Sequence, residues 1–143
     1  MNLKQISIFL ENKPGHLQNV LEILSQKNIN ILTLTIAEVS DFGILRLLLN
    51  KPDDALAALK NANVTCSVTD VLGIAIDDKP GSLLKAIKCF KNNNLNIEYM
   101  YAFTEKRNDK AIMIFRFENI EKAKDSLQKE GYEIIKNSDI IEV

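Results

Sequence analysis

The period of apolar positions changes several times along the first half of the chain, and each change predicts a new element. In residues 4–11, Ile6, Ile8 and Leu10 alternate with Ser7 and Phe9, as in a strand with one face committed to the core. From His16 the apolar residues recur every three or four positions, which predicts a helix that Asn28 ends. The apolar residues of this strand, this helix and a later helix are Ile6, Ile8, Leu10, Leu17, Val20, Leu21, Leu24, Ala55, Leu56 and Leu59.

Further strands are expected at 31–39 and 44–49, around a hairpin turn at 40–43. A helix at 53–61 and a strand at 64–69 follow. The resulting order is βαββαβ. This split pattern predicts an antiparallel sheet with both helices on one face.

The second half of the chain repeats this order. The repeat aligns Pro14 with Pro80 and, after the second strand of each half, Ala55 with Ala123. We expect strands at 70–76, 97–103, 111–117 and 132–136, a helix that buries Leu83, Ala86, Ile87 and Phe90, a charged loop at 105–110, and a helix at 120–130 that ends at Gly131. The repeat predicts an α+β fold class: two tandem ferredoxin-like units, residues 1–70 and 71–143, packed side by side.

Several predicted strands are apolar on both faces, although a sheet covered by helices on one side should show a polar face to water. Residues 31–36, 44–49 and 112–117 all have this character. Scattered surface apolar residues are normal in proteins. We nevertheless expect the second face to be covered, most simply by the partner repeat or by a second chain.

Composition narrows the classes of function. Hydrophobic residues make up 46% of the chain, the net charge is −1 and the pI is about 5.9. These values give no electrostatic basis for binding nucleic acid or an anionic membrane. The sequence begins with no signal segment and holds no long apolar run, so we expect a cytoplasmic protein. The two cysteines, Cys66 and Cys89, are too few and too far apart for a disulfide framework or a zinc site.

The repeated Pro-Gly turn is the stretch with the most chemical meaning. Gly15 and Gly81 each stand where a helix begins, so a ligand can approach unfilled backbone amides, and the helix dipole favours an anion there. Short polar residues lie beside each turn, Asn12 or Asp78, and before the second strand, Asn30 or Asn96. Amides for a carboxylate and side-chain oxygens for an ammonium group suit a zwitterion. A simpler interpretation is that Pro-Gly makes a tight turn and the asparagines cap helices.

The chain resembles the ACT domain family over nearly its whole length, as two tandem copies. The resemblance rests on Glu11-Asn12-Lys13-Pro14-Gly15-His16-Leu17 with Lys27-Asn28-Ile29-Asn30-Ile31, and on Asp77-Asp78-Lys79-Pro80-Gly81-Ser82-Leu83 with Asn93-Asn94-Leu95-Asn96-Ile97. ACT domains are mostly regulatory parts of amino-acid enzymes. They pair side by side into an eight-stranded sheet and bind an amino acid between the first turn of one domain and the second strand of its neighbour.

The resemblance therefore implies two ligand-binding sets. In one, Asn12, Gly15, His16 and Leu17 would face Asn96, and in the other, Asp78, Gly81, Ser82 and Leu83 would face Asn30. Asp78 stands where asparagine is common in the family, so the two sites should differ. His16 fits either a ligand contact or a solvated residue of the first helical turn.

Three other classes of function have less support. We find no nucleophile and base pair, no metal-ligand spacing and no phosphate loop, so we expect no enzyme, no cofactor and no metal. RNA-recognition domains share the βαββαβ order, but Phe115 and Phe117 are better explained as core residues than as a stacking pair. The serious alternative is a subunit that docks on an amino-acid biosynthetic enzyme without a ligand of its own. The expected partners are thus a small amino-acid effector, a second copy in a homodimer, and such an enzyme.

Overall fold

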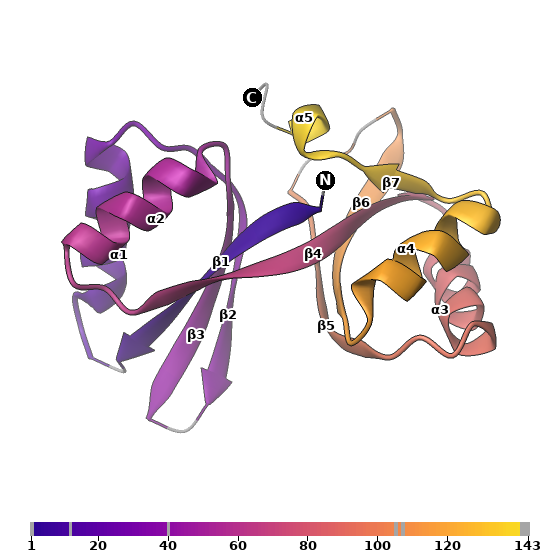
Figure 1. Cartoon of the computed structure of the whole chain (residues 1–143), viewed down its shortest axis with the longest axis horizontal. Helices are drawn as coiled ribbons and strands as arrows, with labels where there is room; N and C mark the ends of the chain where they lie inside the picture. Colours follow the sequence, from indigo (N-terminus) through magenta and orange to yellow (C-terminus); the bar gives the residue numbers. More distant parts are fainter. Residues whose placement is uncertain (1, 12, 40, 105, 107, 141–143) are drawn as a thin grey trace. The chain divides into compact units, whose positions relative to one another are not determined.

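The computed structural model describes residues 2–11, 13–39, 41–104, 106 and 108–140, and it divides into two compact units (Figure 1). The N-terminal unit comprises Lys4–Thr69 with Ile140. The C-terminal unit comprises Asp70–Asp139 with residues 2–3. Each unit is a four-stranded antiparallel α+β arrangement with two main helices, so the predicted fold class is confirmed.

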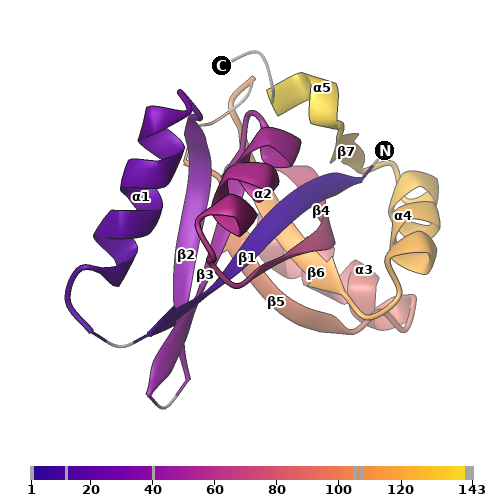
Figure 2. The same ribbon diagram turned by 60° about the vertical axis from the view of Figure 1, so that its left-hand side comes forward.

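The N-terminal unit follows the predicted βαββαβ order. Its elements are β1 (Leu3–Glu11), α1 (His16–Gln26), β2 (Ile31–Val39), β3 (Phe42–Leu49), α2 (Pro52–Asn61) and the start of β4 (Cys66–Asp77). The strands lie in the order β2-β3-β1-β4, and both helices cover one face of this sheet (Figures 1 and 2). Alternation in β1 points Ile6, Ile8 and Leu10 toward the helices, where all three are buried.

The C-terminal unit repeats this topology. Its elements are the rest of β4, α3 (Ser82–Asn92), β5 (Ile97–Ala102), β6 (Lys110–Phe117), α4 (Ile120–Lys129), β7 (Glu133–Ile135) and the short α5 (Asn137–Ile140). The strand order is β7-β4-β6-β5, which is the order of the N-terminal unit with β7 in the place that β4 takes there.

An aromatic cluster fills the C-terminal core. The Phe90 ring lies 5.1 Å from both the Phe115 and the Phe117 ring, in edge-to-face geometry. All three rings are buried. The prediction that Phe115 and Phe117 are core residues is confirmed, and neither ring is available to stack on a nucleic-acid base.

Local backbone signals account for where the helices begin and end. Gly131 follows α4 with a φ of 84°, and Asn28 and Asn94 follow α1 and α3 with a φ of 56° each. These positions lie in the left-handed region that glycine and asparagine tolerate best. Only α4 of these three helices begins with a side-chain cap, in which Asn119 accepts a hydrogen bond from the Lys122 N–H at 3.1 Å.

Three local predictions are wrong. The strands expected at 64–69 and 70–76 form one continuous strand, β4, because no glycine or proline breaks the chain where they meet. Strand β3 begins at Phe42 rather than at residue 44, since Phe42 pairs with Glu11. Leu83 is 38% exposed, and α3 instead buries the face that contains Ala86, Cys89 and Phe90.

The sheet faces that point away from the helices differ between the units. In the N-terminal unit Phe9 is 50% exposed, and its ring lies 5.6 Å from that of Phe42. In the C-terminal unit the equivalent position of Phe9 is Ala75, which is buried together with Ile112 and Ile114. No helix in the described part of the chain is long and apolar enough to cross a membrane.

Candidate functional site

The Pro-Gly turn of the N-terminal unit presents an uncapped helix end. Gly15 has a φ of 90° and precedes α1, which has no side-chain cap. A Cβ atom built on Gly15 would meet nothing within 4 Å, so the space beside the glycine is open. An anionic group can therefore reach the first-turn amides of α1, which the helix leaves without backbone acceptors. Asn12, also predicted here, lies outside the described residues.

His16 fastens this turn to the end of β1. Its Nδ1 atom accepts a hydrogen bond from the Glu11 N–H at 2.8 Å, and its side chain is half-buried. The bond fixes the imidazole and leaves Nε2 as the nitrogen that carries the proton. Leu17, the next residue, packs against the core of the unit rather than into the open space. Of these two predicted ligand contacts, His16 has the more suitable position.

The turn of the C-terminal unit has the same backbone and different charges. Gly81 has a φ of 87°, and α3 also begins without a side-chain cap. Asp78 forms an ion pair with Lys106 of the loop between β5 and β6. The hydrogen bond and the negative charge of Asp78 raise the pKa of Lys106. The Asp78 charge, which would oppose a bound carboxylate, is therefore compensated within the unit.

Two further predicted residues lie beside this second turn. The Ser82 N–H donates to the Lys79 carbonyl oxygen at 3.2 Å, so one first-turn amide of α3 already has an acceptor. Leu83 is partly exposed and forms an apolar edge to the turn. The open space at Gly81, like that at Gly15, extends at least 4 Å from the position of a Cβ atom.

Asn30 and Asn96 stand just before the second strand of each unit, and both are exposed. The Asn30 N–H donates to Oδ1 of Asn50 at 2.9 Å. Asn96 instead donates from Nδ2 to a carboxylate oxygen of Glu118 at 3.4 Å. A register irregularity follows each asparagine, between Ile31 and Thr33 and between Ile97 and Tyr99. The backbone at the start of the second strand is thus alike in the two units, but Asn96 has a carboxylate beside it.

Within one unit, the turn and the asparagine lie at opposite ends of the sheet. Glu11, at the end of β1, pairs with Phe42, whereas Ile31, at the start of β2, pairs with Leu49. The distance along β3 between these two pairs corresponds to about 23 Å at the usual rise of a strand. The C-terminal unit has the same arrangement, since Asp77 pairs with Lys110 and Ile97 with Phe117. A turn and an asparagine of the same unit therefore cannot hold one small ligand.

Sequence reasoning missed three polar residues of these regions: Asn50, Lys106 and Glu118. Two of them had a signal, because the repeat aligns Asn50 with Glu118. Lys106 lies in a charged loop that has no counterpart in the shorter turn of the first half. No periodicity could have singled it out.

The described residues contain little reactive chemistry apart from the turns. They hold no group of three His, Cys, Asp or Glu side chains placed to bind a metal ion. Burial raises the pKa of both the Cys66 and the Cys89 thiol, which disfavours the reactive thiolate. Cys66 is half-buried in a strand and Cys89 buried in a helix, as the sequence predicts.

Comparison with known proteins gives the family. A family model described as an ACT domain pair matches residues 1–143. The crystal structure of protein BT0572 from Bacteroides thetaiotaomicron is 40% identical, with a TM-score of 0.93, over 100% of this chain and 98% of that one. No curated protein matches the sequence.

More distant structures share the fold. The regulatory subunits of aspartate kinase from Thermus thermophilus, in a ligand-free form, and from Thermus flavus are each 17% identical, with a TM-score of 0.63. Each comparison covers 90% of this chain and 90% of the other. At this level of identity, the likeness extends to the fold alone.

Proposed function

The chain belongs to the ACT domain family, and from this membership we propose that it is a non-catalytic regulatory protein that binds a small amino acid between ACT-like domains. The observation that carries the proposal is the separation of turn and asparagine within each unit. A complete site needs the turn of one domain and the strand entry of another. That second domain belongs to the same chain or to a second copy in a homodimer.

Two composite sites follow from this separation. One combines Gly15, His16, Leu17 and Asn12 with Asn96, and the other combines Asp78, Gly81, Ser82 and Leu83 with Asn30. In each, the effector carboxylate binds the uncapped first-turn amides of α1 or α3. The effector ammonium group binds side-chain oxygens at the start of the second strand, where Asn96 or Asn30 lies. The site at Asn96 has the stronger acceptor for it, because Glu118 adds a carboxylate.

Binding regulates a partner only if the bound and free states differ in how the domains pair, since a ligand shifts only an equilibrium whose states it distinguishes. The aspartate kinase subunits of similar fold are regulatory by name, which supports an amino-acid biosynthetic enzyme as the partner. Homodimer formation and a cytoplasmic location stay predictions of the sequence.

The second candidate function is a docking module without an effector of its own. It is favoured by the exposed aromatic pair Phe9 and Phe42 on the sheet face of the N-terminal unit. Exposed apolar surface of this kind is common at protein interfaces.

A thermal-shift screen against the twenty amino acids tests the proposal and separates the two candidates. A ligand at about 100 times its dissociation constant adds roughly 2.7 kcal/mol, which raises Tm by several degrees for a protein of this size. We expect one or two amino acids to do so, and Asn96→Ala to reduce the response, because it removes one of the two composite sites. Asn61→Ala, at the exposed end of α2, is the matched control and should leave it unchanged. No response from any amino acid would reject the effector and leave the docking module.

A further inference from the structure

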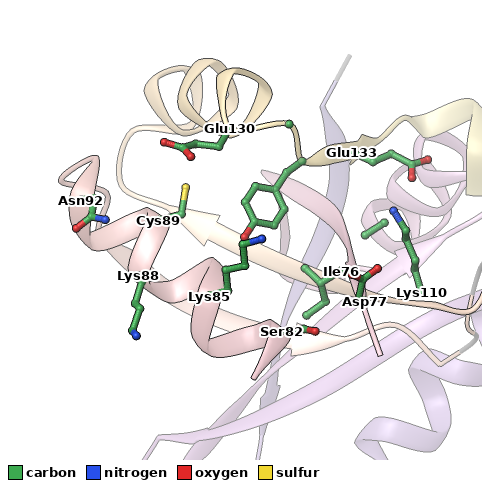
Figure 3. Close-up of a pocket in the computed structure, with 13 residues that line it drawn as sticks. Ile76, Asp77, Ser82, Lys85, Lys88, Cys89, Asn92, Lys110, Glu130 and Glu133 are labelled. Atoms are coloured by element: carbon green, nitrogen blue, oxygen red, sulfur yellow. The ribbon is translucent and has the colours of Figure 1, made fainter. Parts of the chain in front are cut away.

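A polar cavity separate from the turn sites lies within the C-terminal unit, between α3 and the turn that joins α4 to β7 (Figure 3). Its volume is about 390 Å³, within the range of roughly 300–1,000 Å³ that small-molecule sites occupy. All of its lining residues belong to the C-terminal unit. We call it the α3–β7 cavity. It shares only Ser82 with the turn sites described above.

The lining carries both signs of charge in equal number. Lys85, Lys88 and Lys110 provide three ammonium groups, and Asp77, Glu130 and Glu133 provide three carboxylates. Within the described part of the chain, none of these six side chains forms an ion pair or side-chain hydrogen bond. A surface with six charges of both signs and no internal pairing complements a ligand that carries both charges itself.

The floor of the cavity is apolar, and this strengthens charge interactions beside it. Ile76 of β4 is buried, as is Cys89 of α3. Burial and the nearby Cys89 and Glu130 raise the pKa of Tyr132, which places Glu130 beside this less solvated region. In Figure 3, Lys85 and Lys110 stand on either side of Ile76, Glu130 lies beside Cys89, and Lys88 points away from the others.

The fold does not require these charges. At the equivalent positions of the N-terminal unit, Asn19 replaces Lys85, Phe42 replaces Lys110 and Ala62 replaces Glu130. The N-terminal unit forms the same helix, strand and turn without them. A charged cavity that the common fold does not need is available for recognition.

We propose that the α3–β7 cavity binds a free α-amino acid, separately from the sites at the Pro-Gly turns. Lys85 holds the ligand carboxylate, and Glu130 holds its ammonium group. The polar lining favours a small hydrophilic side chain. This site needs only the C-terminal unit, so it would be filled whether or not domains of different chains pair.

The test is an NMR titration of the full-length ¹⁵N-labelled chain with each of the twenty amino acids. The reporters are the amides of Gly131 and Tyr132, which line the cavity, and Asn61, in the other unit, is the reference. We expect at least one amino acid to shift both reporters to saturation while Asn61 stays fixed. Its 2-oxo acid and its decarboxylated amine, which each keep one charge, should bind at least about tenfold more weakly.

Three variants then assign the contacts. Lys85→Gln and Glu130→Gln should each raise the dissociation constant measured at the Gly131 amide about tenfold or more. Lys91→Gln removes the same charge from the same helix, but Lys91 does not line the cavity, so it should change affinity less than about twofold. A shift at Gly131 that persists in Asn96→Ala shows that this site is independent of the turn sites.

Several results would overturn the proposal: no amino acid shifts Gly131 and Tyr132, or the 2-oxo acid binds as tightly as the amino acid, or Lys91→Gln weakens binding as much as Lys85→Gln. A thermal response that Asn96→Ala reduces, without any shift at Gly131, would support the turn sites and reject this cavity. The reverse pattern would support the cavity and reject the turn sites.

Discussion

The two units have the same backbone where geometry is demanding, but different side chains around it. Gly15 and Gly81 have φ values of 90° and 87°, and Asn28 and Asn94 both have 56°. The side chains next to these positions differ: His16 accepts a backbone hydrogen bond in one turn, and Asp78 pairs with Lys106 in the other. The left-handed positions therefore specify the fold, whereas the surrounding charges are free to specify a ligand.

The two cores show the same freedom. When the two copies of the repeat are aligned, the aromatic cluster Phe90, Phe115 and Phe117 corresponds to Leu24, Leu47 and Leu49. All six side chains are buried, and each set lies at the centre of its own core. One topology therefore accepts either an aromatic or an aliphatic centre, as expected when volume and patterning matter more than residue identity.

The largest expected effect is a loss of stability that differs between these two cores. Phe90→Ala should lower the free energy of unfolding by about 4 kcal/mol, and Leu24→Ala by about 3 kcal/mol, because the phenylalanine loses edge-to-face contacts as well as volume. Urea unfolding followed by far-UV circular dichroism measures both, since the chain has no tryptophan. A larger loss for Leu24→Ala would mean that the aromatic contacts add nothing to the C-terminal core.

The next largest effect, the loss of stability on replacing the turn glycines, should be equal in the two units. Gly15→Ala and Gly81→Ala should each cost about 1–2 kcal/mol, because both residues have positive φ and neither new Cβ atom meets a neighbour. Gly15→Asn and Gly81→Asn should cost less, since asparagine tolerates this conformation. Thermal unfolding of the four variants gives the comparison. Costs that differ by more than about 1 kcal/mol between the units would break the equivalence of the turns.

A smaller effect should appear only in the C-terminal turn, and it depends on the proposed effector site. Lys106→Met exposes the uncompensated charge of Asp78, so amino-acid affinity there should fall by about threefold to tenfold at low salt. Adding Asp78→Asn should restore it. Calorimetric titration of the double-mutant cycle tests the coupling. Equal losses with and without Asp78→Asn would place the role of Lys106 elsewhere.

The smallest effect concerns pH and the N-terminal turn. The Lys13 hydrogen bond and charge lower the pKa of Glu11 below its ordinary 4.5. A carboxylate with a lowered folded-state pKa stabilises the fold above the ordinary value, and this contribution is lost as the pH falls below it. Lys13→Met should therefore reduce Tm slightly at about pH 7, and this difference should shrink as the pH falls below the ordinary pKa of 4.5.

Lys79→Met is the matched control for this last prediction, since Lys79 occupies the equivalent place and forms no ion pair within the described residues. It should leave the pH dependence of Tm unchanged. A pH-dependent difference of the same size in both variants would mean that the Glu11 ion pair is not its source.

Most of the fold could be predicted from the sequence, because local signals and the repeat agree with each other. The alternation of Ile6, Ile8 and Leu10 and the helical spacing after His16 each point to one buried face, and the second half provides an independent copy of both. The errors occur where tertiary context decides. Leu83 and Cys89 both fit an amphipathic helix, and only the packing of α3 decides that Cys89 faces the core.

The candidate site could be predicted only in part. The two glycines could be predicted from the sequence because positive φ restricts residue choice so strongly. The ion-pair partner of Asp78 could not be predicted, because Lys106 lies far along the chain in a loop without periodicity. The α3–β7 cavity could not be predicted either, since its charged residues come from separate segments that only the fold brings together.

Strand β4 has a consequence for any attempt to study the halves separately. Its first residues belong to the N-terminal unit and the rest to the C-terminal unit, without a break between them. Cleaving the chain after Asp70 would therefore sever a strand and expose new strand ends, which are prone to aggregate. It would also deprive the C-terminal unit of Leu3 and the N-terminal unit of Ile140. A cut at this point of the chain would therefore yield two incomplete units.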